Sequence, residues 1–380
     1  MGGDAGYRAL QGSQCHTRQR IRRLSLEVWS SQHSSCSNQR ILFSESSLFV
    51  YPYKVILKTC GTTLNLLGLP RILEIADEEC GLKTVTKCFY SRKSFMFPDR
   101  QSGPHRGWKE EVEFLDKHFP GGAAYTVGKM NGDHWLLWLI DNTSPTADSI
   151  PSSPFQTFTP IPATPPDSNA ESESEEPLDY TLEILMSNLS PKSRDHFFFP
   201  SLDASTTTEN GEDRPVPSPH ERALVLSEKL GISSIFPPSM SQLDAYAFDP
   251  CGYSGNAVIS PKNPGMGEGY WTIHVTPEEG WSYASFECNV PSSASPDDLS
   301  HLPSSFPSLL TLIQRVVDIF QPGNLSLTLF VSNNPPSHNS PIETAQSTFR
   351  KALHSRGYKR TDKITYEFAG YDLAFASFKL

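Results

Sequence analysis

The sequence lacks any long apolar run. A membrane-spanning helix needs about 18 or more consecutive apolar residues, and no stretch of this chain approaches that length. The first 23 residues are rich in arginine but have no apolar core, which disfavours a secretory signal. A basic start is typical of a mitochondrial presequence, but Asp4 and the poor amphipathic pattern weaken that interpretation. We expect a cytoplasmic protein that does not act at a membrane.

Paired cysteines and an excess of basic charge are also missing. The seven cysteines are scattered without a CxxC pair, so the pattern gives no sign of a zinc or other metal site. Reduced thiols are the default expectation for such a chain. Lys and Arg together number 32 against 42 Asp and Glu, which gives a formal net charge of −10. A nucleic-acid-binding protein would need a basic face, whereas an acidic chain suits a cationic ligand.

The chain does contain enough apolar sequence for a sizeable core. Of its 380 residues, 37% are hydrophobic and 11% aromatic, which suits one large domain or two modest ones. The 32 prolines cluster with Ser, Thr and acidic residues. Such segments bury too little apolar surface to offset the conformational entropy that they would lose on becoming ordered. We expect residues 1–23 to be disordered and residues 24–380 to form a single domain, with surface insertions at about 143–177, 200–219 and 291–307.

Strands outnumber helices in the sequence pattern. Helices are expected at 64–77, 108–119, 308–320 and 341–355. Runs rich in β-branched and aromatic residues predict strands at 47–59, 133–141, 180–187, 245–250, 269–276, 281–288, 325–332 and 371–379. Because the βαβ alternation of a doubly wound fold is missing, the expected class is α+β with antiparallel sheets.

Six short segments, taken together and in order, carry a family resemblance. They are Phe43–Phe49 (FSESSLF), Lys58–Thr63 (KTCGTT), Phe89–Lys93 (FYSRK), Thr181–Met186 (TLEILM), Phe248–Ser254 (FDPCGYS) and Tyr270–Glu278 (YWTIHVTPE). Any one of them alone would be weak evidence, but their joint order is specific. The chain resembles eukaryotic S-adenosylmethionine decarboxylase, a pyruvoyl-dependent enzyme, from about Leu24 to the C-terminus outside the insertions.

The resemblance implies a four-layer α/β/β/α sandwich and an enzyme of spermidine and spermine biosynthesis. It implies that the pyruvoyl cofactor is derived from Ser46 of the chain itself. The Ser46 hydroxyl would attack the Glu45 carbonyl, and loss of the Ser46 α-proton from the resulting ester would release Glu45 as a carboxylate. Two chains would result, about 1–45 (the β chain) and 46–380. The pyruvoyl carbonyl would form a Schiff base with S-adenosylmethionine and act as the electron sink for loss of CO₂.

By the same resemblance, four residues are catalytic. Besides Ser46, they are His274, which would remove the α-proton near neutral pH, and Ser254, which would hydrogen-bond the oxyanion. Cys60 would return a proton to the substrate after CO₂ leaves. The alternation of side chains along 270–276 agrees with this, because it turns His274 away from the apolar set of Trp271, Ile273 and Val275.

The resemblance also implies a substrate site made by Phe43, Glu45, Phe248 and Glu278. Phe248 would stack on the adenine, and an aromatic face would also favour the nearby sulfonium. Glu278 would accept hydrogen bonds from the ribose hydroxyls, and the backbone of Glu45 would contact the adenine edge.

A separate acidic set is implied to bind putrescine as an activator. Its members are Glu27, Asp179, Glu183 and Glu287. Because clustered buried carboxylates repel one another and lose hydration, a diamine would stabilise them. We therefore expect stimulation by putrescine. A homodimer is left open by the sequence.

The N-terminal part departs from the family pattern. Gln19–Ser25 (QRIRRLS) is basic where members carry an acidic run with a phenylalanine that lines the substrate site. Residues 30–42 are several tens of residues shorter than the corresponding family segment, which includes a strand beside the cleavage strand. We therefore expect an exposed sheet edge beside the cleavage site.

These departures leave alternatives open. One is a catalytically impaired homologue, or a faulty translation of an active gene, that acts if at all as a regulatory partner subunit and stays one uncut chain. Another is a hydrolase that uses Cys60 and His274, which would be inhibited by thiol alkylation but not by carbonyl reagents.

Overall fold

The computed structural model describes most of the chain outside the expected insertions. The described residues are 22–29, 39–43, 46–59, 63–95, 97–132, 134–142, 179–199, 217–260, 268–292, 306–332, 341–368 and 370–380. Most of the N-terminal segment 1–23 and of the three predicted insertions lies outside them. At two places the structure corrects the predicted bounds: a strand begins at Arg22, and Ser218 caps a helix that begins at Pro219.

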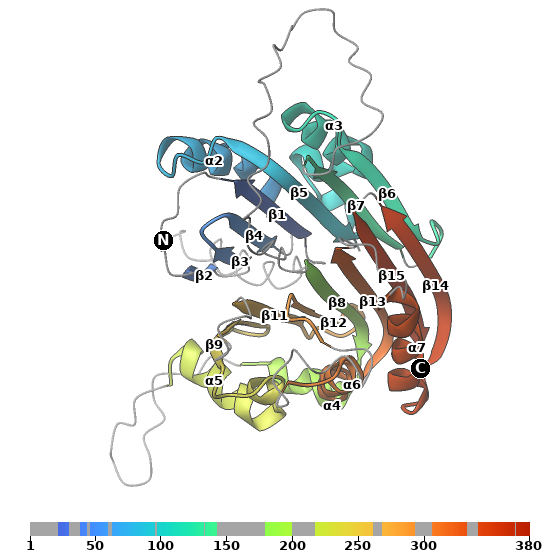
Figure 1. Ribbon diagram of the computed structural model, residues 1–380. Helices are drawn as coiled ribbons and strands as arrows, with labels where there is room; N and C mark the ends of the chain where they lie inside the picture. Colours follow the sequence, from blue (N-terminus) through green and yellow to red (C-terminus); the bar gives the residue numbers. More distant parts are fainter. Residues whose placement is uncertain are drawn as a thin grey trace, which may run out of the picture.

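Two antiparallel sheets form the centre of the molecule (Figure 1). Sheet A has the order β2-β3-β4-β1-β5-β7-β6. Its strands are β1 (Arg22–Trp29), β2 (Gln39–Phe43), β3 (Ser46–Val50), β4 (Lys54–Thr59), β5 (Thr84–Lys93), β6 (Ala123–Gly128) and β7 (His134–Asp141). Sheet B has the order β14-β15-β13-β8-β12-β11-β10-β9. Its strands are β8 (Tyr180–Leu189), β9 (Ser241–Ala247), β10 (Tyr253–Ile259), β11 (Gly269–Thr276), β12 (Tyr283–Cys288), β13 (Pro322–Ser332), β14 (Lys359–Phe368) and β15 (Tyr371–Lys379).

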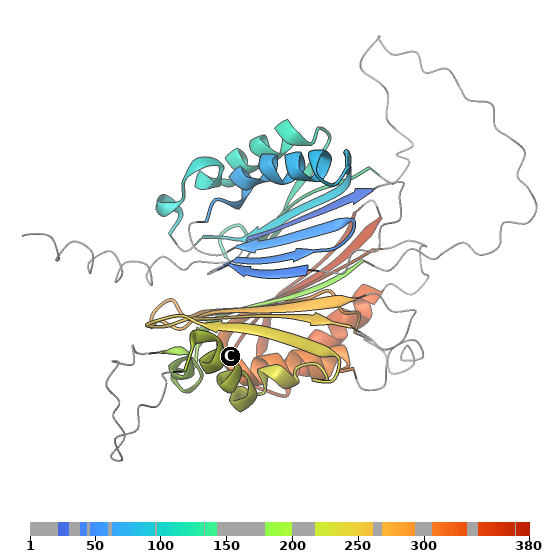
Figure 2. The same ribbon diagram turned by 90° about the vertical axis from the view of Figure 1, so that its left-hand side faces the viewer.

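Helices cover the outer face of each sheet, so the molecule has four layers (Figure 2). Sheet A is covered by α2 (Asn65–Glu78) and α3 (Trp108–His118). Sheet B is covered by α4 (Pro191–Arg194), α5 (Pro219–Leu230), α6 (Leu309–Phe320) and α7 (Pro341–His354). The expected α/β/β/α sandwich is confirmed. Among the described residues, no helix is both long and apolar enough to cross a membrane.

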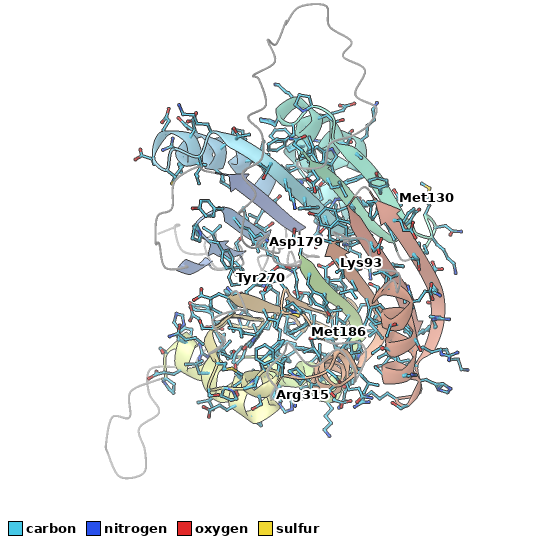
Figure 3. The ribbon with its side chains drawn as sticks, in the orientation of Figure 1. Lys93, Met130, Asp179, Met186, Tyr270 and Arg315 are labelled. Atoms are coloured by element: carbon cyan, nitrogen blue, oxygen red, sulfur yellow. The ribbon has the colours of Figure 1, made fainter. Side chains whose placement is uncertain are left out.

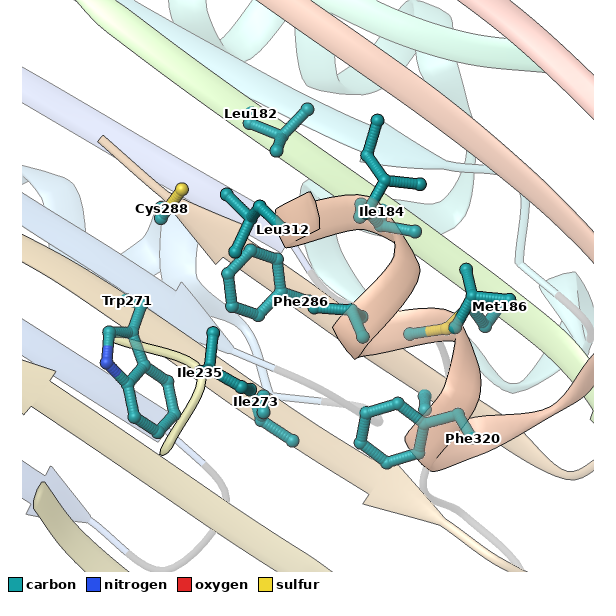
Figure 4. Packing of buried hydrophobic residues seen from close by; sticks show 14 of the residues in the cluster. Leu182, Ile184, Met186, Ile235, Trp271, Ile273, Phe286, Cys288, Leu312 and Phe320 are labelled. Atoms are coloured by element: carbon teal, nitrogen blue, oxygen red, sulfur yellow. The ribbon is translucent and has the colours of Figure 1, made fainter. Parts of the chain in front are cut away.

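The largest core lies between sheet B and its helices (Figure 4). Leu182, Ile184 and Met186 of β8 point into it, and Leu312 and Phe320 of α6 pack there as well. Because strand side chains alternate, the residues of β8 between these three face the other sheet. One of them is Glu183, which contacts Lys58 of sheet A.

The space between the two sheets is divided into an apolar and a polar part. Where β5 and β7 face β13 and β15, rings and aliphatic groups pack together, including Phe330, Tyr371 and Leu373. Where β3 and β4 face β10 to β12, the buried side chains are mostly polar or charged. Figure 3 shows Tyr270, Asp179 and Lys93 between the sheets. The polar part holds most of the residues that the sequence singled out.

The sheet edge beside the predicted cleavage site is not exposed as the sequence led us to expect. β2 pairs antiparallel with β3, and Phe43 lies opposite Ser46. β3 pairs on its other side with β4, where Ser46 lies opposite Thr59. The residues just before the cleavage site therefore supply the covering strand, and the edge of sheet A moves to β2.

Candidate active site

The predicted cleavage point falls at the start of an interior strand. Ser46 is the first residue of β3, and the strand is hydrogen-bonded on both sides. Antiparallel neighbours hold the backbone of a central strand through both N–H and C=O groups. Glu45 and Cys60 lie outside the described residues, and so do the side chains of Phe43 and Glu27.

Ser47, the next residue along β3, contacts sheet B directly. Its Oγ donates a hydrogen bond to Oδ1 of Asn256 at 2.8 Å and lies 2.9 Å from Nε2 of His274. All three side chains are buried. The sequence analysis did not single out Ser47 or Asn256. The sequence features that could have identified them are indirect. Ser47 adjoins Ser46, and Asn256 lies two residues from Ser254 and therefore on the same strand face.

Ser254 and His274 are cross-strand partners in sheet B. They face each other in the register of β10 and β11, and Ser254 Oγ lies 2.9 Å from Nδ1 of His274. Thr272 Oγ1 lies 3.1 Å from Nε2 of the same ring. The structure thus brings together the predicted residues Ser254 and His274 at the start of β3. As predicted, Trp271, Ile273 and Val275 face the opposite side, in the core beneath the helices.

His274 is held as a neutral imidazole. Burial lowers the pKa of His274 to about 3, with a further contribution from the positive charge of Lys58, whereas Glu287 acts in the opposite direction. A neutral ring has one donor and one acceptor nitrogen. Since the Ser47 proton goes to Asn256, the contacts are satisfied when Nε2 carries the ring proton and Nδ1 accepts from Ser254. A buried neutral imidazole of this kind can accept a proton at any pH above its pKa.

The two remaining substrate candidates lie beyond the same end of sheet B. In the sheet register Tyr253 of β10 lies between Ala247 and Val275, so β9 and β11 end at the same edge of sheet B, on either side of β10. Phe248 follows β9, is buried, and packs on Tyr246 with ring centroids 4.8 Å apart. Glu278 follows β11 by two residues and is also buried. Ser254 and His274 lie one residue inside this end, so the predicted groups share one side of the molecule.

Deeper in the polar part, two glutamates share one lysine. Glu183 and Glu287 are cross-strand partners, and Lys58 of sheet A reaches both, at 3.5 Å and 2.7 Å. The Tyr270 hydroxyl donates to the other oxygen of Glu287 at 2.5 Å. Three charged groups buried together are tolerated only when they are paired and hydrogen-bonded. The sequence predicted the two acids but not the lysine between them.

Asp179, just before β8, lies in a second charged group. Lys54 Nζ contacts its Oδ1 at 3.1 Å, Lys87 Nζ lies 3.9 Å from its Oδ2, and the Tyr371 hydroxyl donates to Oδ2 at 3.2 Å. Burial alone would raise the pKa of Asp179, but the two ammonium groups and the hydroxyl outweigh it and lower the pKa. Lys87 also lies 3.8 Å from Asp141. Three of the four acids predicted to bind putrescine are thus placed between the sheets, each close to a lysine.

Comparison with known proteins agrees with this geometry. The sequence profile of the adenosylmethionine decarboxylase family matches residues 14–379. An S-adenosylmethionine decarboxylase proenzyme from Xenopus laevis is 37% identical over 337 residues, which cover 89% of this chain and 78% of the relative. One from Saccharomyces cerevisiae is 31% identical, with 88% and 77% covered.

A solved structure is similar in fold. The crystal structure of the Trypanosoma brucei AdoMetDC-delta26 monomer aligns with a TM-score of 0.52 at 22% identity, covering 88% of this chain and 98% of that one. At this identity the likeness concerns the fold, whereas the family follows from the sequence matches. The chain therefore belongs to the adenosylmethionine decarboxylase family and is a carboxy-lyase of polyamine biosynthesis.

Proposed function

We propose that this chain is a proenzyme that cuts itself between Glu45 and Ser46 and decarboxylates S-adenosylmethionine with the pyruvoyl group so formed. The observation that carries the proposal is the buried contact of His274 with Ser254 and Ser47, directly beside residue 46. This contact supports the proposal because it brings a neutral histidine and two hydroxyl groups to the residue that follows the bond to be broken.

The cleavage begins with the chain's own serine. The Ser46 hydroxyl adds to the carbonyl carbon of Glu45, the C–N bond breaks, and the proton passes from oxygen to the new amine. The peptide becomes an ester without gain or loss of atoms. In the folded proenzyme the Ser254 hydroxyl donates to Nδ1 of His274; turned toward the oxyanion of the addition step, it would stabilise that charge and leave Nδ1 free to act as the base.

The second step needs a base. His274 takes the Ser46 α-proton, the ester C–O bond breaks, and Glu45 leaves with the electron pair as a carboxylate. The dehydroalanine that remains at position 46 takes up water and loses ammonia, which leaves a ketone. The lowered pKa keeps His274 unprotonated and ready for this step at neutral pH.

The residues at the start of β3 fit a pyruvoyl group. Buried polar groups from Ser254, His274 and Asn256 surround the strand next to position 46, and they can hydrogen-bond a carbonyl in place of water. When formed, the group supplies the electron sink for loss of CO₂. The neighbouring strands fix the backbone of β3 on both sides and would hold the group formed from its first residue.

Substrate binding is proposed for the residues at the end of sheet B. Phe248 offers an aromatic face for the adenine, and Glu278 a carboxylate for the ribose hydroxyls. Phe43 and Glu45 are proposed to complete this site. Cys60, which follows the last residue of β4, is proposed as the proton donor that completes the amine product. The cytoplasmic location and a homodimer stay predictions.

Intact mass and gel analysis of the purified protein test the proposal. We expect two chains, 1–45 and 46–380, with the larger blocked by a group that reacts with borohydride. The Ser46→Ala variant is the control and should remain a single chain. A wild-type protein that stays whole, with no carbonyl at any terminus, would refute the proposal and favour the impaired homologue. The Cys60–His274 hydrolase gains no support from the described residues, because both ring nitrogens of His274 contact hydroxyl groups.

A further inference from the structure

The edge strand β9 of sheet B carries an aromatic residue on the face of the candidate active site. Ala245 and Ala247 lie in the core beneath the helices. Because strand side chains alternate, Tyr246 between them faces the other way, toward sheet A. Its ring packs on Phe248, with centroids 4.8 Å apart, so the two rings lie on the same side. This is the face of sheet B on which His274 contacts β3.

The strand register places Tyr246 next to the residues of the proposed chemistry. It is the cross-strand partner of Ser254 in β10. Ser254 is in turn the partner of His274 in β11, and the two side chains are 2.9 Å apart. Tyr246 is thus adjacent both to the ring proposed to hold the adenine and to the hydroxyl beside the proposed base. The sequence analysis did not single it out.

A histidine from the neighbouring helix holds the Tyr246 ring. His220 is the second residue of α5, which lies beside β9 (Figure 1). Its ring meets Tyr246 edge-on, with centroids 5.1 Å apart and planes at 89°. Nδ1 of the same histidine lies 3.4 Å from Oδ1 of Asp244, which precedes Tyr246 by two positions on the same strand face. The rings of His220, Tyr246 and Phe248 therefore form a row from the start of α5 to the end of β9.

This row restricts the orientation of Phe248. The planes of Phe248 and Tyr246 are tilted by 49°. Aromatic pairs prefer tilted, offset or edge-on arrangements and are stabilised beyond the area they bury, so the position of one ring constrains the plane of the other. A ring that is already oriented loses little conformational entropy when a base stacks on it. The pair should therefore bind an adenine more tightly than Phe248 alone.

We propose that Tyr246 is a positioning residue for Phe248, and that its ring, held by His220, fixes the plane on which the adenine of S-adenosylmethionine stacks. This inference rests on the proposed function, in which Phe248 binds the adenine. The groups assigned to cleavage, Ser254 and His274, contact each other directly. Loss of the Tyr246 ring should therefore raise KM and leave kcat and self-cleavage unchanged.

The first experiment measures KM and kcat from CO₂ release by the processed enzyme. Tyr246→Ala should raise KM by about 2- to 12-fold, the effect of losing one aromatic pair. Tyr246→Phe keeps the ring and should restore the KM of the wild type. Tyr366→Ala is the matched control, because Tyr366 stacks on Phe368 two positions further along β14, at the opposite edge of sheet B. It should leave KM unchanged.

A double-mutant cycle tests whether Tyr246 acts through Phe248. Effects of residues that act through one another do not add. The variant Tyr246→Ala/Phe248→Ala should therefore have the KM of Phe248→Ala alone. His220→Ala should raise KM by less than Tyr246→Ala does. An unchanged KM in Tyr246→Ala, or two single effects that multiply in the double variant, overturns the inference.

A second readout does not depend on cleavage. The probe is 5′-methylthioadenosine, which carries the adenosine part and the sulfur of the substrate but no amino group. A ligand that binds the folded state raises the midpoint of thermal unfolding. We expect a rise in wild type and in Tyr246→Phe, and a smaller rise in Tyr246→Ala. Equal rises in all three overturn the inference.

The outcomes separate the two proposals. If no protein is cut under any condition, the proposed function fails, and the thermal response to 5′-methylthioadenosine still decides whether Tyr246 supports binding of the adenosine part. If the enzyme is cut and active but Tyr246→Ala loses kcat at an unchanged KM, the proposed function stands and the positioning role of Tyr246 is refuted.

Discussion

The Ser47 hydroxyl lies 2.9 Å from Nε2 of His274, although 227 positions separate the two residues in the sequence. The contact joins β3 of sheet A to β11 of sheet B, so it exists only when the two sheets have packed on each other. Under the proposed function, self-cleavage that depends on His274 would therefore be coupled to complete folding. A chain with only one sheet formed would have the bond to be cut but not the proposed base.

The neutral state of His274 predicts how cleavage depends on pH. Because its pKa is lowered to about 3, the basic form is fully populated above about pH 5 and is lost only as the pH falls toward 3. The rate of proenzyme cleavage should therefore show no inflection near 6.5 between pH 5 and 8. Rates from gels of newly purified proenzyme test this, and an inflection at the ordinary histidine pKa would contradict it.

Removal of the base should arrest the reaction at the ester. In His274→Ala the Ser46 hydroxyl can still attack, but nothing takes the α-proton, so one chain should remain on neutral gels. Hydroxylamine attacks an ester faster than an amide and should then release the 1–45 fragment as a hydroxamate. Ser46→Ala, treated in the same way, should not be cut. Resistance of His274→Ala to hydroxylamine would argue that the residue acts before the ester forms.

Ser47 should act as a positioning residue for His274. Ser47→Ala removes two buried contacts and leaves Oδ1 of Asn256 without this donor. A lost buried hydrogen bond costs about 1–3 kcal/mol, so if this cost falls on the transition state, cleavage should slow by about 5- to 150-fold. Ser47→Thr keeps the hydroxyl and should be cut nearly as fast as wild type. The assignment fails if Ala and Thr variants are cut equally fast.

Substitution of Phe248 should weaken substrate binding and leave self-cleavage of the proenzyme unchanged. Loss of one base–aromatic stack is worth about 1–3 kcal/mol, which corresponds to a rise in KM of about 5- to 150-fold in Phe248→Ala. Phe248→Tyr should retain most of the affinity. CO₂ release from S-adenosylmethionine measures KM, and gels show the extent of cleavage. A Phe248→Ala protein with impaired cleavage but unchanged KM would show that Phe248 supports the fold instead.

The sequence allowed better predictions of local secondary structure than of contacts between distant residues. Alternation along 270–276 identified the strand and the face of His274, because apolar residues at every second position must face a core. The helix Pro219–Leu230 was not predicted, and only its first residue fell within the insertion expected at 200–219, although Ser218 and Glu221 form a capping box that the sequence already carries. The helix predicted at 64–77 was found as α2 (Asn65–Glu78), with Pro70 inside it.

Pairing between distant strands could not be predicted in the same way. No short-range sequence pattern indicates that Gln39–Phe43 pairs with β3, or that Lys58 lies between Glu183 and Glu287. Such partners depend on the register of both sheets and on how the sheets pack. Lysines at 54 and 87 have no sequence feature that distinguishes them from surface lysines, so the internal charge balance became visible only in the structure.

Lys58 provides the clearest test of that charge balance. Lys58→Met keeps an apolar stem of similar length but removes the ammonium group from two buried carboxylates. Breaking a buried ion pair by removing one partner costs about 3–5 kcal/mol. Urea unfolding in the uncut Ser46→Ala background should show a loss of this size in the free energy of unfolding. The uncut background is used because a single chain unfolds without dissociation of a fragment.

Matched variants separate this effect from the loss of a surface charge. Lys363→Met breaks the exposed pair with Glu343 and should change the free energy of unfolding by no more than about 1 kcal/mol. Adding Glu287→Gln to Lys58→Met removes one of the two uncompensated charges and should recover part of the stability. If Lys58→Met costs no more than Lys363→Met, the two glutamates must be stabilised by protonation or by other groups, and Lys58 is not what holds these charges between the sheets.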